Sequence, residues 1–113
     1  MKKVLFVCSP EHFSYGFYAL EKLPEKEIEL EIVDYSVALK KMEEKNYNTI
    51  LFAHDIRGGE FFKKVTEITE KRKQKLCRLS YKNDLSGNDG YFSIQMSQSD
   101  KFIRNIRTVV LER

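Results

Sequence analysis

Side chains that can do chemistry lie at the ends of three predicted strands of this 113-residue chain, two of which are continuously apolar. Cys8 and Ser9 come at the end of the first of these strands, His54 and Asp55 after the second, and Ser80 near the end of the third. Apolar runs of this length are typical of strands that are buried on both faces of a parallel sheet. In such sheets ligands bind at the carboxyl ends of the strands, so this is where the sequence predicts a functional site.

His12 lies close to Cys8 in the sequence, and with Cys8, His54, Asp55 and Ser80 it is a candidate for lining a small-molecule pocket. His54 and Asp55 are adjacent on a predicted strand, so their side chains point to opposite faces. They therefore do not form a catalytic dyad.

Cys8 is the candidate nucleophile, because a thiolate is stabilised at the start of a helix and a predicted helix follows it. The competing interpretation is that Cys8 and Cys77 are small hydrophobic residues buried in strands. Neither cysteine has a neighbour at the spacing of metal ligands, so the pair predicts no disulfide framework and no metal site.

The composition indicates one globular domain over residues 1–113, with 42% hydrophobic and 33% charged residues. The net charge of +3 is small and spread along the chain, so nucleic acid is not an expected partner. Five apolar residues, Val4 to Cys8, precede Ser9-Pro10, too few for a signal peptide or a membrane span. We therefore expect a cytoplasmic protein.

The first elements that position these residues are a strand at Val4–Cys8 and a helix from the Ser9 cap to about Lys22. Phe13, Phe17 and Leu20 recur on one side of this helix and form its apolar face. The next strand, Glu27–Val33, alternates apolar residues with glutamates. That pattern predicts an edge strand, and its row of glutamates discourages edge-to-edge pairing.

A second helix begins at Asp34 or Ser36 and reaches about Lys45, with Tyr35, Ala38, Leu39 and Met42 on its apolar face. The buried strand Thr49–Ala53 follows. A third helix covers about Glu60 to Lys73, and the basic run Lys71–Lys75 at its end complements the helix dipole.

The remaining segments are a strand at Leu76–Tyr81, a loop at Lys82–Gly90, a second edge strand at Tyr91–Met96 and a last helix. The order predicts an α/β three-layer sandwich with a five-stranded, mainly parallel sheet in the order 2-1-3-4-5. The fourth helix of such a fold is missing or vestigial, because the loop replaces it. Parallel crossovers usually need a dozen or more residues, so both directions remain open for the fifth strand.

This pattern resembles the receiver domains of two-component response regulators over nearly the whole chain. The segments that carry the resemblance are Lys3–Pro10, Val33–Leu39, Asn46–Phe52, Leu79-Ser80, Tyr91–Met96 and Phe102–Arg107. The family transfers a phosphoryl group to an Asp, with a metal held by carboxylates and with a Lys and a Ser or Thr at the phosphoryl oxygens.

The departures from that family carry the functional prediction. The acid-pair positions match Cys8 and Ser9, the acceptor position matches Ala53 and the Lys position matches Gln95, while Ser80 keeps the hydroxyl. The resemblance thus implies a degenerate switch pocket without a metal or other cofactor. Asp55 lies two residues beyond Ala53, points to the same side of the strand and is the candidate for a displaced acceptor.

We therefore expect a phosphorylation-independent regulatory or protein-interaction domain that is not an enzyme. Its partner is a protein, and a homodimer through Tyr91–Met96 is one prediction. The alternative is a Cys8-dependent phosphocarrier or thiol enzyme, because Cys8-Ser9 resembles the start of the phosphocysteine loop of sugar phosphotransferase IIB proteins. The Cys8-Ser9 segment resembles the start of the low-molecular-weight tyrosine phosphatase loop more loosely. That loop needs an Arg six residues after the Cys, and this chain has Ser14 there.

Overall fold

The computed structural model describes residues 1–53, 59–80 and 92–111, and these contain one five-stranded sheet. The strands are β1 (Lys2–Val7), β2 (Ile28–Val33), β3 (Thr49–Ala53), β4 (Lys75–Ser80) and β5 (Phe92–Gln95). They lie in the order β2-β1-β3-β4-β5, as the sequence predicted. Every neighbouring pair is parallel, including β4 and β5, so the question of the fifth strand's direction is settled.

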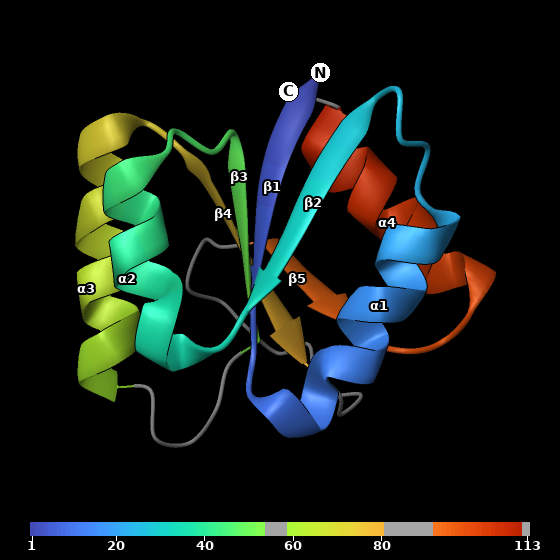
Figure 1. Cartoon of the computed structure of the whole chain (residues 1–113), viewed down its shortest axis with the longest axis horizontal. Coiled ribbons are helices and arrows are strands. Elements are labelled where there is room, and N and C mark those ends of the chain that lie inside the picture. Colours follow the sequence, from blue (N-terminus) through green and yellow to red (C-terminus); the bar gives the residue numbers. More distant parts are fainter. Residues whose placement is uncertain (54–58, 81–91, 112–113) are drawn as a thin grey trace.

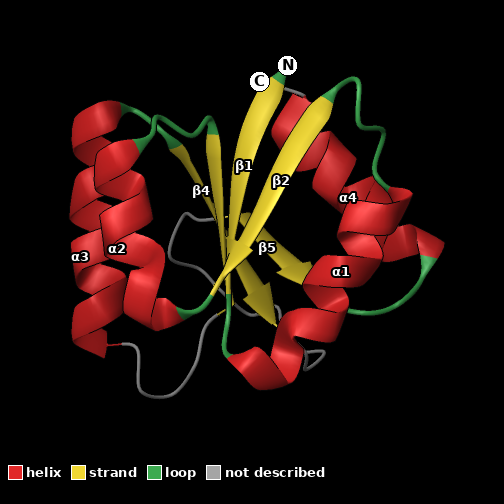
Figure 2. Ribbon diagram, viewed as in Figure 1, coloured by secondary structure: helices red, strands yellow, loops and turns green. Residues whose placement is uncertain are grey.

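Helices cover both faces of the sheet and complete the predicted three layers (Figure 1). A short 3-10 turn at Pro10–His12 leads into α1 (Phe13–Lys22), and α2 (Tyr35–Glu44), α3 (Gly59–Arg72) and α4 (Asp100–Leu111) follow. Helices α2 and α3 lie on one face, and α1 and α4 on the other (Figure 2). In the described part of the chain, no helix has the length and apolar character needed to cross a membrane.

Alternation along the central strands divides the core into two halves. Val4 and Phe6 of β1 face α1 and α4, whereas Leu5 and Val7 face α2 and α3. All four side chains are fully buried, as is most of β3. These two strands are continuously apolar because neither face meets water, which is why the sequence placed them at the centre of the sheet.

Helix α1 corrects one expectation. Of its predicted apolar face, Phe13 packs against the core, but Phe17 is 57% exposed and Leu20 42%. The side that packs on the sheet is instead formed by Gly16 and Ala19, which are buried. A Cβ atom at Gly16 would lie 3.0 Å from Ile32 Cδ1 on β2, so the small residues let the helix approach the edge strand closely.

The basic run at the end of α3 has structural roles. Arg72 donates a hydrogen bond to the carbonyl of Met42, and Gln74 Nε2 donates to the carbonyl of Tyr47 at 2.9 Å. Lys75 donates to the carbonyl of Val109 on α4. The run therefore ties α3 and β4 to the elements beside them, in line with its placement at a helix end.

The predicted loop Lys82–Gly90, and with it the missing or vestigial fourth helix, lies outside the described residues. The described chain resumes at β5, which is parallel to β4 and pairs Ser80 with Gln95. The second edge strand is therefore in its predicted place.

Candidate functional site

The candidate site lies along the carboxyl ends of the parallel strands. Ala53 is the last residue of β3, Ser80 the last of β4 and Gln95 the last of β5, while Cys8 and Ser9 directly follow β1. The register pairs Ala53 with Leu79 and Ser80 with Gln95, so the strand ends stand next to one another. The strands run in one direction and end at the same edge (Figure 2). Sequence reasoning placed these residues at the correct edge.

Cys8 is buried and unactivated. Its thiol lies in the apolar cluster between the sheet and the helices α1 and α4, and its backbone N–H donates to the carbonyl of Val33 at 3.1 Å. Burial, with a smaller contribution from the negative charge of Asp34, raises the pKa of the Cys8 thiol to about 12. Cys77 is also buried, and burial raises its pKa to about 12. The interpretation of both as buried hydrophobic residues is confirmed.

Ser9 is buried but does not cap the helix with its side chain, contrary to the sequence prediction. Its Oγ lies 2.9 Å from Nδ1 of His12 and 3.2 Å from Oε1 of Glu11, to which the hydroxyl donates. Pro10 has no N–H, and the tight 3-10 turn brings residues 11 and 12 back onto the hydroxyl. The backbone N–H of His12 also donates to the carbonyl of Ser9, at 2.9 Å.

This cluster of Ser9, Glu11 and His12 differs from a catalytic triad in one respect. In a triad the carboxylate accepts a hydrogen bond from the histidine and so orients it toward the serine. Here the Glu11 carboxylate accepts from the serine itself. The three residues form a local polar cluster at the carboxyl edge. Sequence reasoning noted His12 as a pocket residue but missed its bond to Ser9.

The end of the central strand is occupied by an apolar residue and held by an aromatic one. Ala53 is buried, and its carbonyl accepts a hydrogen bond from the hydroxyl of Tyr35 in the first turn of α2. The Tyr35 ring packs edge-on against Phe52 and Phe61, with centroids 5.4 Å and 5.6 Å away. The sequence placed Tyr35 on the apolar face of its helix but carried no signal for this bond.

A carboxylate does stand at this edge, on Asp34 after β2, but it has a structural task. Its Oδ1 accepts a hydrogen bond from the backbone N–H of Ser36 at 2.8 Å and so caps α2. The hydrogen bond from the Ser36 hydroxyl contributes most to holding the pKa of Asp34 below its usual value. Asp34 rather than Ser36 is thus the cap, one of the two alternatives that the sequence left open.

The structure describes only some of the other predicted site residues. The Gln95 side chain is half-buried, and Ser80 is placed by its backbone pairing alone. His54 and Asp55 lie outside the described residues, so the candidate displaced acceptor stays a prediction. Among residues 1–53, 59–80 and 92–111, no group of three His, Cys, Asp or Glu side chains is arranged to hold a metal ion.

Comparison with solved structures shows which known fold this chain has. No family model and no curated protein sequence matches the chain. Among solved structures, it is similar to the response regulator TrrA of Thermotoga maritima in complex with Mg²⁺ and BeF. The identity is 21%, the match covers 97% of this chain and 100% of TrrA, and the TM-score is 0.67. The chain has the receiver-domain fold.

Two further structures show the same receiver fold. In the complex of the T. maritima histidine kinase ThkA with TrrA, a chain is 20% identical with a TM-score of 0.66, covering 96% of this chain and 98% of that one. A two-component transcriptional regulator AraC of Clostridium phytofermentans is 11% identical with a TM-score of 0.71, covering 98% and 93%. These likenesses span almost the whole chain, which agrees with the extent of the resemblance found in the sequence.

Proposed function

We propose that this chain is a phosphorylation-independent, receiver-like domain that regulates through protein contact and not through catalysis, in the cytoplasm. The observation that carries the proposal is the buried Ala53 at the end of the central strand, where the receiver resemblance expects an acceptor Asp. The side chain of alanine is a methyl group and offers no oxygen that could accept a phosphoryl group. Its carbonyl is engaged by Tyr35 on the α2 side.

The surroundings of Ala53 support the same proposal. A divalent metal such as Mg²⁺ needs oxygen ligands, usually carboxylates. At the end of β1 stand a neutral, buried thiol and a serine whose hydroxyl is bonded to Glu11 and His12. The one acid at the end of the neighbouring β2, Asp34, is engaged as a helix cap. Ser9, Ala53, Asp55, Ser80 and Gln95 thus form, in this proposal, a degenerate switch pocket.

The thiol alternative is disfavoured by the state of Cys8. A phosphocarrier or thiol enzyme needs an accessible thiolate, stabilised by positive charge or a helix N-terminus. Cys8 is fully buried, and the charge that shifts its pKa is the negative one of Asp34. Both features raise the pKa of the thiol and slow its reactions.

A protein partner is the expected route of regulation. The solved complex of TrrA with a histidine kinase supports protein contact as a use of this fold. A homodimer through Tyr91–Met96 stays a prediction for this chain. Of the described side chains on that edge, Ile94 and Met96 are buried beneath α4, so their apolar surface is already covered within the chain.

The proposal is tested by offering the chain a phosphoryl group and its mimic. In the first experiment the protein is incubated with acetyl phosphate and Mg²⁺, and its intact mass is measured by mass spectrometry. In the second it is titrated with Mg²⁺ and beryllofluoride, and the amide chemical shifts are followed by NMR. TrrA, which holds Mg²⁺ and BeF in its structure, is the positive control. We expect no added phosphoryl group and no saturable shifts. Stable labelling that disappears in Asp55→Asn would overturn the proposal and make Asp55 the acceptor.

A further inference from the structure

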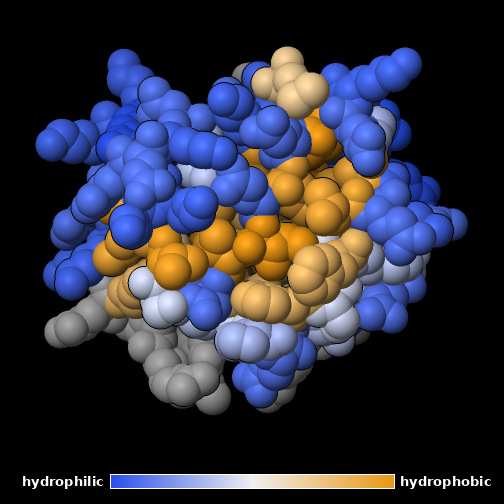
Figure 3. Space-filling view, viewed as in Figure 1, coloured by the Kyte–Doolittle hydropathy of each residue, from blue (hydrophilic) through white to orange (hydrophobic). Residues whose placement is uncertain are grey.

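An exposed apolar surface lies on the β2 edge of the sheet, opposite β5. Its most exposed members are Phe17 and Leu20 of α1, at 57% and 42%, and Val37 of α2, at 40%. The half-buried Ile32 of β2 lies next to Gly16 of α1. Figure 3 shows apolar residues gathered across the middle of this face, over β2 and the helices beside it. A continuous patch of this kind marks an interaction site in a soluble protein.

The close seat of α1 on β2 creates this surface. Gly16 and Ala19 face the sheet, and successive residues of a helix are turned by about 100°. Phe17 and Leu20 therefore stand on the flank of the helix and not under it. Since β2 is an outer strand and α1 packs on it, that flank borders the open edge of the sheet.

The backbone of β2 offers hydrogen bonds on the same side. Lys2 N–H donates to the carbonyl of Glu27 at 2.9 Å, and Cys8 N–H donates to that of Val33 at 3.1 Å. In a parallel pair alternate residues bond to the same neighbour, so the odd-numbered residues of β2 serve β1. Ile28, Leu30 and Ile32 consequently direct their N–H and C=O groups away from the sheet, and of these the N–H of Ile28 is already bonded to the carbonyl of Pro24 at 3.0 Å.

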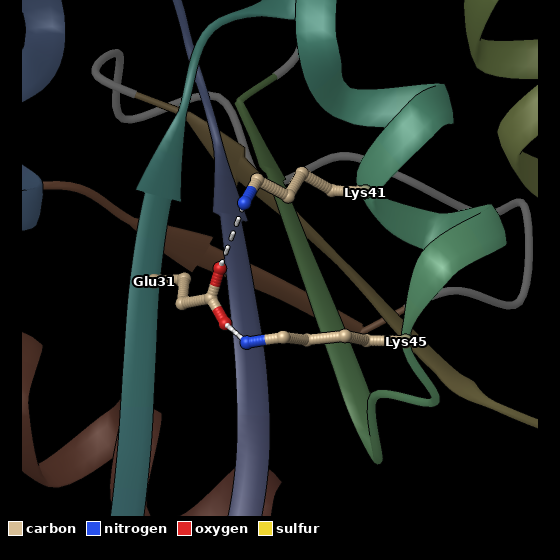
Figure 4. A network of polar contacts seen from close by, with 3 residues as sticks. All are labelled: Glu31, Lys41 and Lys45. Carbon is tan, nitrogen blue, oxygen red and sulfur yellow. Dashed lines mark hydrogen bonds and ion pairs between the residues drawn. The ribbon is translucent and has the colours of Figure 1, made fainter.

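The glutamate row that the sequence assigned to guarding this edge is largely neutralised. Glu27 accepts from Arg107 of α4, with Oε2 3.2 Å from Nη2. Glu31 is bound by Lys41 of α2 and by Lys45 directly after that helix (Figure 4), with its carboxylate oxygens 2.6 Å from Lys45 Nζ and 3.9 Å from Lys41 Nζ. The hydrogen bond from Lys45 contributes most to lowering the pKa of Glu31. Glu31 and its two lysines thus carry a net positive charge, whereas Glu29 makes no ion pair among the described residues.

We propose that a second copy of this chain docks on this edge, with β2 antiparallel to the partner's β2 about a two-fold axis at Leu30. In that register Leu30 pairs with its own copy and exchanges both backbone hydrogen bonds with it, and Ile28 pairs with Ile32, whose N–H donates to the Ile28 carbonyl. The N–H of Ile28 keeps its bond to the carbonyl of Pro24. The same patch serves both copies, as a two-fold dimer requires. This inference goes beyond the proposed function and does not depend on it.

Charge and shape both favour a second copy as the occupant. The register sets Glu29 of one copy directly opposite Glu31 of the other, so the Glu29 carboxylate meets the partner's group of Glu31, Lys41 and Lys45, which carries a net positive charge. On the opposite face of the joined sheet, the two α1 helices lie side by side across the dimer interface. Phe17 and Leu20 of one copy then pack against Phe17 and Leu20 of the other. This contact removes from water the most exposed aromatic and leucine side chains of the described helices.

The first test is the oligomeric state, measured by sedimentation equilibrium from low to high micromolar concentration. We expect a mass of twice the 13.4 kDa chain at the upper end. The double variant Phe17→Glu with Leu20→Glu should weaken dimerisation at least about tenfold, because each glutamate would face its copy across the seam. Both side chains are exposed, so circular dichroism should remain unchanged. Lys63→Glu with Lys64→Glu, on exposed positions of α3, is the matched control and should leave the dimer intact.

The second test fixes the register by cross-linking. Residues opposite each other without hydrogen bonds lie about 4.5 Å apart between Cα atoms, within the range of a disulfide. We expect a mixture of Glu29→Cys and Glu31→Cys chains to oxidise to a covalent heterodimer, whereas each variant alone should cross-link far less. Cys8 and Cys77 are buried and can be retained.

Either of two results overturns the proposal. One is a monomer over the whole concentration range, which leaves the patch to a different protein. The other is a dimer that tolerates the glutamates at Phe17 and Leu20 and shows no cross-link between residues 29 and 31. That result combined with weakening by Gln95→Lys would assign the dimer to the β5 edge.

Discussion

The Tyr35 hydroxyl donates a hydrogen bond to the backbone carbonyl of Ala53, which joins the first turn of α2 to the last residue of β3. The two residues are 18 apart in sequence, and the bond is made at the carboxyl edge of the sheet. Tyr35→Phe keeps the ring packing against Phe52 but leaves a buried carbonyl without this donor. We expect a loss of about 1 kcal/mol in the free energy of unfolding, measured by urea titration.

Tyr18→Phe is the control for that measurement, since Tyr18 is only partly buried on α1. It should change the stability by less than half as much. Equal stability of Tyr35→Phe and the parent chain would contradict a structural role for the bond.

The Cys8 thiol provides a prediction on reactivity. With a pKa of about 12, its thiolate population at pH 8 is about a thousandfold below that of a free thiol with the reference value of 9.0. We expect iodoacetamide to label the folded protein very slowly, with a rate that still rises above pH 10. In urea both cysteines should react at once. Rapid labelling of Cys8 at neutral pH in a Cys77→Ala variant would restore the thiol alternative.

The same shifts predict how stability depends on pH. Folding raises the pKa of both thiols from about 9 to about 12, so above pH 9 the unfolded chain releases protons that the folded chain retains. The thiols therefore impose no penalty below pH 9, and stability falls as the pH rises from 9 toward 12. The measurement is the urea midpoint of the parent chain across that range. Cys8→Ala is the comparison, because its midpoint should decline less steeply.

The sheet could be predicted because strand burial is a local property. Val4 to Val7 and Thr49 to Ala53 are apolar at every position, and β2 alternates, so centre and edge are encoded within each segment. The rotation of α1 could not be predicted this way. Hydrophobicity selects Phe13, Phe17 and Leu20, but close approach to Ile32 selects the small residue Gly16.

The candidate site was predictable in position but not in its contacts. Strand ends follow from the apolar runs, which brought Ala53 and Gln95 to the right edge. The hydrogen-bond partners depend on geometry that residue types do not encode. Serine is a residue type that commonly caps helices, yet in the 3-10 turn the hydroxyl of Ser9 points toward His12. The Tyr35 bond depends on how α2 docks beside β3.

Lys73 occupies a conformation that favours glycine, with φ at 56° directly after α3. The chain closes the helix there, with the Gln74 N–H donating to the carbonyl of Thr69 at 2.8 Å. A residue with a side chain pays about 1–2 kcal/mol to adopt the left-handed conformation, and glycine avoids this cost. Glycine also loses more backbone entropy on folding, which cancels part of that gain in stability. We therefore expect Lys73→Gly to stabilise the protein by about 0.5–1 kcal/mol.

Lys71→Gly is the matched control, since it makes the same replacement two residues earlier, inside α3. There glycine should destabilise by up to about 1 kcal/mol. Opposite signs for the two variants in the same urea titration would support the helix-end geometry, and a loss of stability in Lys73→Gly would refute it.

Gly16 and Ile32 form the contact that sets α1 on the edge strand, and their coupling can be measured. An added Cβ at Gly16 would meet three atoms of Ile32, at 3.0 Å from Cδ1, 3.1 Å from Cγ1 and 3.2 Å from Cγ2. Because all three atoms crowd the same point, a rotation of the Ile32 side chain does not relieve them all. We expect Gly16→Ala to destabilise the parent chain even though alanine favours a helix by about 1 kcal/mol.

In an Ile32→Ala background those three atoms are gone, so Gly16→Ala should instead stabilise the protein by about 0.5–1 kcal/mol. The double-mutant cycle then gives a coupling energy of at least about 1 kcal/mol. Gly16→Ala effects that are the same in both backgrounds would mean that α1 does not rest on Ile32. In that case the flank carrying Phe17 and Leu20 would not border the β2 edge either, so this cycle also tests the geometry on which the edge-to-edge dimer depends.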